Sequence, residues 1–479
     1  MPGWSFHNGE TSASVSTSNL VDVNQLSASD APALHAELER IGVDQTKPNY
    51  ALKLESGKSI THNRFVVPEW GNLRFDLHVP EAELKRGRSV LVTLSAADGS
   101  PLGVSSSINL TRAKQTRGAY LEDTQRIDYG IQGFETFQFE VPDNLRGKVA
   151  NLKFEVVGGG TVYLDNVFFK SQHLLFGNPS DARNTTDLDV ANRDNYLLEK
   201  AQFATAYDDS SKTPKWVSWQ MNQKWLGNTS RSNLRFIEDK SIPETWGRIV
   251  HEDYTNSDYS RGHMLPSSHR TNSEKDNIAT FLLTNVVPQH FDNNDNFRGE
   301  IPDNPAWTSF DDLLASNVDT DSKELYVVAG GYESNLNPQR ISHRARPSAL
   351  TQPQILTNKG INIPGWTWKV VLELERPGIS PSDVRATNAV SYGILTPNEV
   401  EPAHVPTNPN GSVGNNGDFA LPVPHPFNAL LGLNLPEIPN KAAWRNWQTW
   451  KLTVNQIEEL TELDFFSNIP DEIEEIIES

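Results

Sequence analysis

The segment YSRGHMLP at residues 259–266 decides the fold of the second half, together with TNVVPQ at 284–289 and DNNDN at 292–296. The first segment contains His263, a side chain that can take a proton from water. The asparagines of the later segments carry amide oxygens, which suit a hard divalent cation. A base and a cation are the parts that phosphodiester hydrolysis needs. The three segments therefore predict a site that hydrolyses phosphate esters. No residue in this scheme would recognise a nucleotide base.

These residues resemble the DNA/RNA non-specific endonucleases with the ββα-metal, or His-Me finger, active site. The family signature is Asp-Arg-Gly-His, and this chain has SRGH at 260–263. The resemblance runs from about residue 173 to the end of the sequence and is closest to the secreted bacterial sugar-non-specific nucleases. Further segments support it: GNPS at 177–180, WVSWQ at 216–220, WLGN at 225–228, VVAGGY at 327–332 and IEELT at 457–461. It implies an α+β nuclease domain at 173–479 that cuts DNA and RNA with one Mg²⁺ or Mn²⁺ per site.

The resemblance assigns roles residue by residue. His263 matches the general base, and Asn294 matches the one direct protein ligand to the metal, at unchanged spacing. Asn285 matches an asparagine that orients the histidine region. Arg261 is the arginine of the signature and is expected to contact phosphate. Ser260 stands where the family has Asp, which removes a carboxylate next to the base.

The arginine that grips the phosphate is expected to be Arg231, with Arg235 as the alternative if the register shifts. An insertion follows Asn294, because Trp307 comes thirteen residues later, further on than in the family. The carboxylate of the metal site is therefore expected to be Asp311, or Glu300 if the insertion folds differently. The insertion also makes Asn304 a rival to Asn294 as metal ligand.

The first 172 residues show a different pattern. Apolar and polar residues alternate at 72–79, 89–94, 137–141, 152–156 and 161–167, between turns rich in Gly, Pro and Asn. Alternation with a period of two predicts an antiparallel β-sandwich. Residues 171–193 are rich in Gly, Asn, Ser, Asp and Thr, which suits a linker, and we expect the domain boundary near residue 172.

The ends of this first domain, at 3–6 and 161–169, resemble the first and last strands of jelly-roll carbohydrate-binding modules. The resemblance implies a polysaccharide or cell-surface ligand stacked on an exposed aromatic ring. The candidate rings belong to Trp4, Trp70 and Tyr120. It also implies that Asp165 could hold a structural Ca²⁺. We therefore expect a multidomain chain with an all-β jelly-roll domain at 1–172 and the α+β domain at 173–479.

Composition limits the remaining choices. The formal net charge is −19, so attraction to nucleic acid has to come from a local basic cleft. Residues 452–479 carry nine Asp or Glu and no Lys or Arg, which is about half of that net charge. The chain has no cysteine, so any metal must bind O and N ligands. No apolar run predicts a membrane span, and the N-terminus lacks signal-peptide features. We expect a secreted or extracellular protein, by analogy with the bacterial nucleases.

Two other hypotheses remain open at this stage. In one, Ser260 and the insertion have abolished catalysis, and the chain is a binding protein that keeps a nuclease fold. In the other, the chain acts at a cell surface or on a polysaccharide through its N-terminal domain.

Overall fold

The computed structural model describes most of the chain, with gaps. The described residues are 4–7, 12–14, 20–22, 50–67, 73–80, 87–109, 126–128, 135–139, 141, 143–145, 148–168, 172–183, 193–257, 259–294, 305–332, 352–398 and 425–479. Within them, no helix is both long and apolar enough to cross a membrane.

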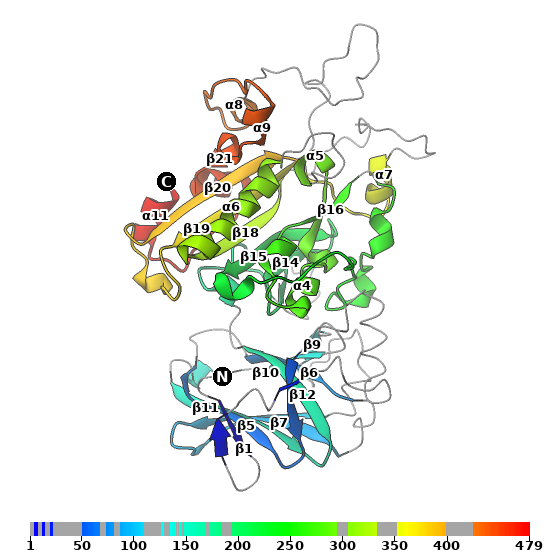
Figure 1. The fold of residues 1–479 in the computed structure, drawn as a ribbon, viewed down its shortest axis with the longest axis vertical. Coiled ribbons are helices and arrows are strands. Elements are labelled where there is room, and N and C mark those ends of the chain that lie inside the picture. The colour runs from blue at the N-terminus through cyan, green and yellow to red at the C-terminus, as the bar shows by residue number, and fades with distance from the viewer. Residues whose placement is uncertain are drawn as a thin grey trace.

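The N-terminal part contains two antiparallel sheets of six strands each (Figure 1). The first has the order β2 (Ser12–Ser14), β1 (Trp4–His7), β5 (Ser59–Val66), β11 (Val149–Val157), β7 (Ser89–Ala96) and β8 (Pro101–Asn109). The second has the order β3 (Leu20–Asp22), β4 (Tyr50–Glu55), β12 (Thr161–Phe168), β6 (Leu73–His78), β10 (Glu135–Phe139) and β9 (Arg126–Asp128).

The two sheets share one apolar core, as the alternating sequence predicts. Along β7, the inward positions Val90, Val92 and Leu94 are fully buried. Phe154 of the first sheet meets Phe75 of the second edge to face, with ring centres 4.9 Å apart. This confirms the prediction of antiparallel sheets, whereas the likeness to jelly-roll carbohydrate-binding modules stays a prediction.

The carbohydrate ligand also stays a prediction. Trp70 and Tyr120 lie outside the described residues, and Trp4 is described only as part of a strand. Asp165 is described, and its carboxylate is hydrogen-bonded to the ammonium group of Lys275 in the second half of the chain. A lysine therefore lies where a structural Ca²⁺ was expected.

The C-terminal part is built on an antiparallel sheet of seven strands and is α+β, as predicted. Its strands, in spatial order, are β13 (Tyr196–Glu199), β14 (Ala204–Asp208), β15 (Thr213–Met221), β18 (Glu324–Tyr332), β19 (Trp366–Leu374), β20 (Ala389–Pro397) and β21 (Lys451–Leu452). A separate pair is formed by β16 (Ser260–His263) and β17 (Val286–Gln289). The helices are α4 (Glu274–Ala279), α5 (Phe291–Asn294), α6 (Ala306–Asp321), α7 (Gln352–Thr357), α8 (Pro426–Leu430), α9 (Lys441–Arg445), α10 (Val454–Thr461) and α11 (Asp471–Glu478).

Helix α6 is the longest of these and lies along the central sheet (Figure 1). Its buried apolar residues Trp307, Phe310, Leu314 and Val318 recur at spacings of three and four, so they form one face that packs against the core. The helix ends at Ser322, which has a left-handed backbone. Helices α10 and α11 both pack against β20.

The segment that follows the sandwich is not an exposed linker over residues 172–183. His173 is buried, and its carbonyl accepts a hydrogen bond from the Ser218 hydroxyl at 2.6 Å. Its ring Nδ1 accepts one from the backbone amide of Gln220 at 3.0 Å. Leu174 and Phe176 enter the core of the second half. The polar composition of this segment wrongly suggested a linker, because its few apolar side chains are the ones that pack into the core.

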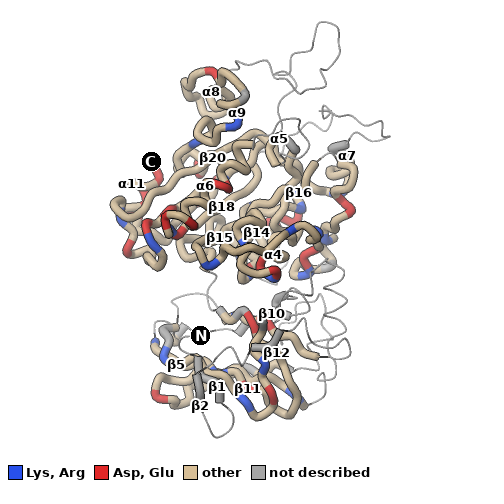
Figure 2. Tube along the Cα trace, in the orientation of Figure 1, with Lys and Arg blue, Asp and Glu red and all other residues tan. Residues whose placement is uncertain are grey.

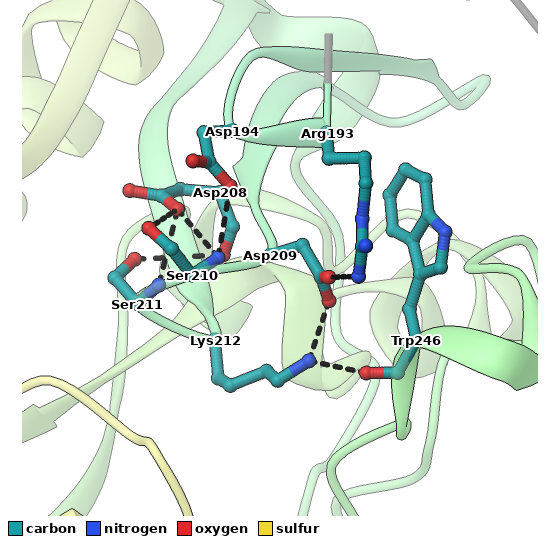
Figure 3. A network of polar contacts seen from close by, with 8 residues as sticks. All are labelled: Arg193, Asp194, Asp208, Asp209, Ser210, Ser211, Lys212 and Trp246. Atoms are coloured by element: carbon teal, nitrogen blue, oxygen red, sulfur yellow. Dashed lines mark hydrogen bonds and ion pairs between the residues drawn. The ribbon is translucent and has the colours of Figure 1, made fainter. Parts of the chain in front are cut away.

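A polar network closes the turn between β14 and β15 (Figure 3). One Asp208 carboxylate oxygen accepts hydrogen bonds from the amides of Ser210 and Ser211, at 2.8 and 3.0 Å. Asp209 is ion-paired with both Arg193 and Lys212. This network fixes the hairpin and ties it to the preceding segment.

Helix α11 ends in a buried carboxylate that should make stability depend on pH. Only 4% of Glu478 is exposed, and its Oε1 is buried with no hydrogen-bond partner among the described residues. Burial, aided by nearby carboxylates, raises the pKa of Glu478 to about 9. The folded state therefore keeps a proton that the unfolded state releases above its ordinary pKa near 4.5. Stability consequently falls as the pH rises from about 4.5 to about 9.

We expect Glu478→Gln to raise Tm by ~2–4 °C at pH ~8.5 and to change it little at pH ~5. Thermal unfolding at both pH values measures this. Glu475→Gln removes an exposed carboxylate from the same helix and is the matched control. An equal gain in both variants would show that the effect comes from general charge reduction.

Candidate active site

A cavity of about 1140 Å³ opens beside β16. Six residues predicted from the sequence line it: Arg231, Ser260, Arg261, His263, Asn294 and Asp311. Asn285 is fully buried behind the wall, and Arg235 is not among the lining residues. The rivals Glu300 and Asn304 lie outside the described residues.

His263 is the last residue of β16 and pairs with Val286 of β17. Its ring packs against two phenyl rings that also contact each other, because the centres of Phe236 and Phe281 are each 4.9 Å from the imidazole centre and 5.0 Å from one another. Nε2 of the imidazole is buried and no described residue is hydrogen-bonded to it. Burial, and then the positive charge of Arg231, hold the pKa of His263 well below its usual range. The imidazole is therefore neutral at pH 7 and can accept a proton.

Asn285 fixes the chain that follows His263. Its carboxamide oxygen accepts a hydrogen bond from the Leu265 amide at 2.9 Å. Its Nδ2 donates to the carbonyls of Leu265 and Thr280, at 2.9 and 2.8 Å. In addition, the backbone amide of Met264 donates to the Asn285 carbonyl at 2.9 Å. This residue therefore joins β16 to the end of α4, and its orienting role stays a prediction.

Gly262 permits the close approach of β17. A Cβ atom at this position would lie 2.0 Å from the side-chain oxygen of Gln289 and 2.5 Å from its Cγ. Gln289 is fully buried, so its side chain has no open space to enter. The glycine of the RGH motif is thus required by the packing of β16 against β17.

The guanidinium of Arg261 contacts residues 251–255, which form the rim of the cavity. Its Nη2 donates to the carbonyl of His251 at 2.5 Å and to the Thr255 hydroxyl at 3.4 Å. The guanidinium also lies 5.6 Å from the centre of the Tyr254 ring. Half-buried Ser260 lines the same wall and lies opposite Gln289 in the strand pairing. Arg261 therefore holds the rim segment 251–255, in addition to any contact with phosphate.

Arg231 is better placed than Arg235 to meet an anion in the cavity. It is exposed, lines the wall, and has its guanidinium 5.2 Å from the centre of the Phe281 ring. Its charge also acts on His263, as the lowered pKa of that histidine shows. This geometry favours the first of the two registers that the sequence left open.

Asn294 and its neighbour Asn293 have different surroundings. Asn293 is buried, where its Nδ2 donates to the Thr367 hydroxyl at 2.7 Å and its Oδ1 accepts from the Thr396 hydroxyl at 3.3 Å. Asn294 instead lines the cavity, at the end of α5, which packs against β16. Of these two amides, only that of Asn294 is placed to offer an oxygen to a cation.

Asp311 also lines the cavity and is buried in an ion pair. Its Oδ1 accepts a hydrogen bond from Nζ of Lys369 at 2.5 Å, and this lysine is fully buried. Nζ of Lys369 also lies 3.4 Å from the centre of the Trp307 ring. Burial raises the pKa of Asp311, and the ammonium group of Lys369 opposes the rise. Lys369 therefore keeps a carboxylate available at a buried position.

The oxygen donors of the cavity wall suit a divalent cation that has few protein ligands. The described residues contain no cluster of three His, Asp or Glu side chains that could enclose a metal. The cavity wall does present the amide of Asn294 and the carboxylates of Asp311 and Asp312, which are hard oxygen donors. A cation held by one amide oxygen and by water, with a carboxylate nearby, is consistent with these residues.

Sequence reasoning missed the aromatic wall and the partner of Asp311. Phe236 and Phe281 carry no motif, and their role depends on where the chain brings them. Lys369 did leave a signal, because it is a charged residue inside the apolar strand WTWKVVLEL at 366–374. A lysine in such a run is expected to have a buried partner.

Charge is distributed locally around the site. Figure 2 shows acidic and basic positions interspersed along the described part of the second half of the chain. Attraction of an anion to the cavity therefore depends on the few cations of its wall, Arg231 above all.

Comparisons with known proteins agree with this picture. A family model described as DNA/RNA non-specific endonuclease matches residues 182–472. A nuclease from Nostoc sp. is 34% identical over 309 residues, which cover 64% of this chain and 85% of that protein. Mitochondrial nuclease EXOG from Mus musculus is 27% identical, over 36% of this chain and 43% of its own length. Mitochondrial endonuclease G from Bos taurus is 33% identical, over 28% and 42%. The chain spans less than half the length of these two mitochondrial relatives.

Packing at Gly262 can be tested directly. We expect Gly262→Ala to lower the free energy of unfolding by about 1–3 kcal/mol, because the added methyl group overlaps the buried Gln289 side chain. Denaturant unfolding measures the loss. In a Gln289→Ala background the same substitution should be nearly neutral, because the overlapping atoms are gone. Equal losses in both backgrounds would contradict this explanation.

Proposed function

The chain belongs to the DNA/RNA non-specific endonuclease family, and we propose that it hydrolyses phosphodiester bonds of both DNA and RNA with His263 as general base and Mg²⁺ or Mn²⁺ as cofactor. The observation that carries the proposal is the place of His263. Its ring packs against two phenyl rings on a cavity that Arg231 and Asn294 also line, and burial lowers its pKa.

The chain's own residues perform distinct tasks in this proposal. His263 removes a proton from the water that attacks phosphorus, and its low pKa keeps it unprotonated until that moment. Arg231 binds the phosphate and offsets its negative charge. The cation, held by Asn294 with Asp311 nearby, would neutralise charge on the phosphate oxygens and on the departing 3′ oxygen when bound. Asn285 and Gly262 position the base and do not touch substrate.

The rest of the wall supports activity on either sugar and on any sequence. It includes small hydroxyl side chains, namely those of Thr229, Ser230, Ser257, Ser267, Ser268 and Thr271. Hydroxyls of this kind contact sugar and phosphate, which carry no sequence information.

Ser260 does not by itself favour the hypothesis of an inactive binding protein. The side-chain contacts that hold the histidine segment come from Asn285, Phe236 and Phe281. The substituted residue makes none of these side-chain contacts. Secretion remains a prediction that rests on the resemblance to secreted bacterial nucleases.

The first test is digestion of a plasmid and of RNA by the purified chain with Mg²⁺, with Mn²⁺ and with EDTA. We expect cleavage of both substrates with either metal and none with EDTA. His263→Ala should lower the rate at least ~10²-fold, because a positioned general base supplies ~10²–10⁴-fold. His62→Ala removes a half-buried histidine of the sandwich and should leave the rate unchanged. Undiminished cleavage by the His263 variant would remove this residue from the mechanism.

The two arginines give a matched comparison, because each variant removes one positive charge. We expect Arg231→Ala to raise KM about tenfold, since a hydrogen bond to a charged group contributes about 1.5–3 kcal/mol. It should also reduce the slope of log affinity against log salt by ~1. Arg235→Ala should change both quantities less. Steady-state cleavage over a range of NaCl concentrations measures both, and the reverse ranking would favour the shifted register.

A further inference from the structure

Two sets of charged contacts join the sandwich to the nuclease half. In the first, Lys275 of α4 is 6% exposed, and its ammonium group is hydrogen-bonded to the carboxylate of Asp165 on β12. The carboxylate of Asp76 on β6 lies 4.0 Å from the same nitrogen. Asp76 and Asp165 are direct neighbours across the two strands, so one lysine faces two carboxylates.

In the second set, Arg74 of β6 contacts the end of β13. Its guanidinium lies 2.6 Å from the carboxylate of Glu199 and donates to the Glu199 carbonyl at 3.3 Å. Only 4% of Arg74 is exposed. Charges buried to this degree persist only when they are paired, so each contact restricts how the two halves can sit together.

The first contact leads to the cavity through α4. Two residues after Lys275, the side chain of Asn277 donates to the carbonyls of Ser267 and Arg270, at 2.7 and 3.0 Å. Asn277 and Ser267 both line the cavity. The carbonyl of Thr280, at the end of α4, accepts the hydrogen bond from Asn285 already described. A displacement of α4 would therefore move two segments of the cavity wall.

The contact between Arg74 and Glu199 also leads to Asn285, through a different set of residues. Lys200, next to Glu199, donates to the carboxylate of Asp239 at 3.1 Å. The other oxygen of Asp239 accepts from the Thr284 hydroxyl at 2.6 Å, and Thr284 directly precedes Asn285. The side chains of this route are buried or nearly so, namely those of Arg74, Glu199, Lys200, Asp239 and Thr284. Both contacts thus end at the residue that holds the segment after His263.

We propose that the N-terminal sandwich positions the active site, and that Lys275, held by Asp165 and Asp76, is a positioning residue for His263. The proposal rests on the proposed nuclease function. Lys275 touches neither the cavity nor any reacting atom; it acts through α4, Asn277 and Asn285. Without the lysine, two neighbouring carboxylates would face each other in a buried interface and repel, so α4 would lose its place.

The test compares three variants of the full chain. Lys275→Met removes the charge at similar length, and Lys275→Arg keeps it. Lys323→Met is the matched control, because it breaks a pair with Glu373 at 2.6 Å on β19, which belongs to neither route. We expect Lys275→Met to lower kcat by ~10- to 10²-fold with KM little changed, because small misplacements of a catalytic group have effects of this size. Lys275→Arg should recover most of the loss, and Lys323→Met should lower Tm without changing kcat.

A second measurement needs no substrate. Hydrogen exchange at the Leu265 amide reports the bond to Asn285, and it should become faster in Lys275→Met but not in Lys323→Met. If Lys275→Met does not fold, Asp165→Asn, which leaves Asp76 beside the lysine, should show smaller changes of the same kind.

Unchanged kcat and unchanged exchange in a folded Lys275→Met would overturn the proposal, and so would equal losses in the Lys323 control. If the unaltered chain cuts no nucleic acid with any metal, the nuclease function fails instead, and the exchange measurement still decides whether the sandwich holds the His263 segment.

Discussion

The organisation of the site depends on one buried side-chain amide. Asn285 uses its oxygen and its nitrogen in three hydrogen bonds, to both backbone groups of Leu265 and to the end of α4. A buried amide that lost one of these partners would carry an unpaired polar group, which costs about 1–3 kcal/mol. The segment after His263, the strand β17 and helix α4 therefore keep their relative positions together.

That constraint explains how one cavity provides two environments. Beside β16, His263 packs against two phenyl rings, and its burial keeps the imidazole neutral. Elsewhere on the wall, hydroxyls and Asn294 offer polar groups, and exposed Arg231, which lies over the Phe281 ring, adds a positive charge. The pKa of the base and the binding of the anion are linked, because the charge of Arg231 also lowers the pKa of His263. A chain with a net charge of −19 can thus attract an anion through a local wall.

Much of this could be predicted from sequence, because local patterns carry it. Alternation predicted antiparallel sheets in the first half, and the spacing of the histidine and asparagine segments placed His263 and Asn294 on one cavity. The missed features depend on residues far apart in the chain. Lys275 and Asp165 are 110 positions apart, so nothing near Asp165 distinguishes a lysine partner from a bound Ca²⁺. The same holds for Asp311 and Lys369, which are 58 positions apart.

The contacts between the two halves show why charge, and not apolar area, sets their arrangement. Ala51 and Tyr163 of the sandwich do reach the core of the second half, but apolar contact is tolerant of sliding. Buried ion pairs are not, because a small shift separates the charges while both remain out of water. Their desolvation offsets much of their attraction, so they add less to stability than to the choice of one orientation. Since both pairs lead to Asn285, that orientation fixes the position of His263.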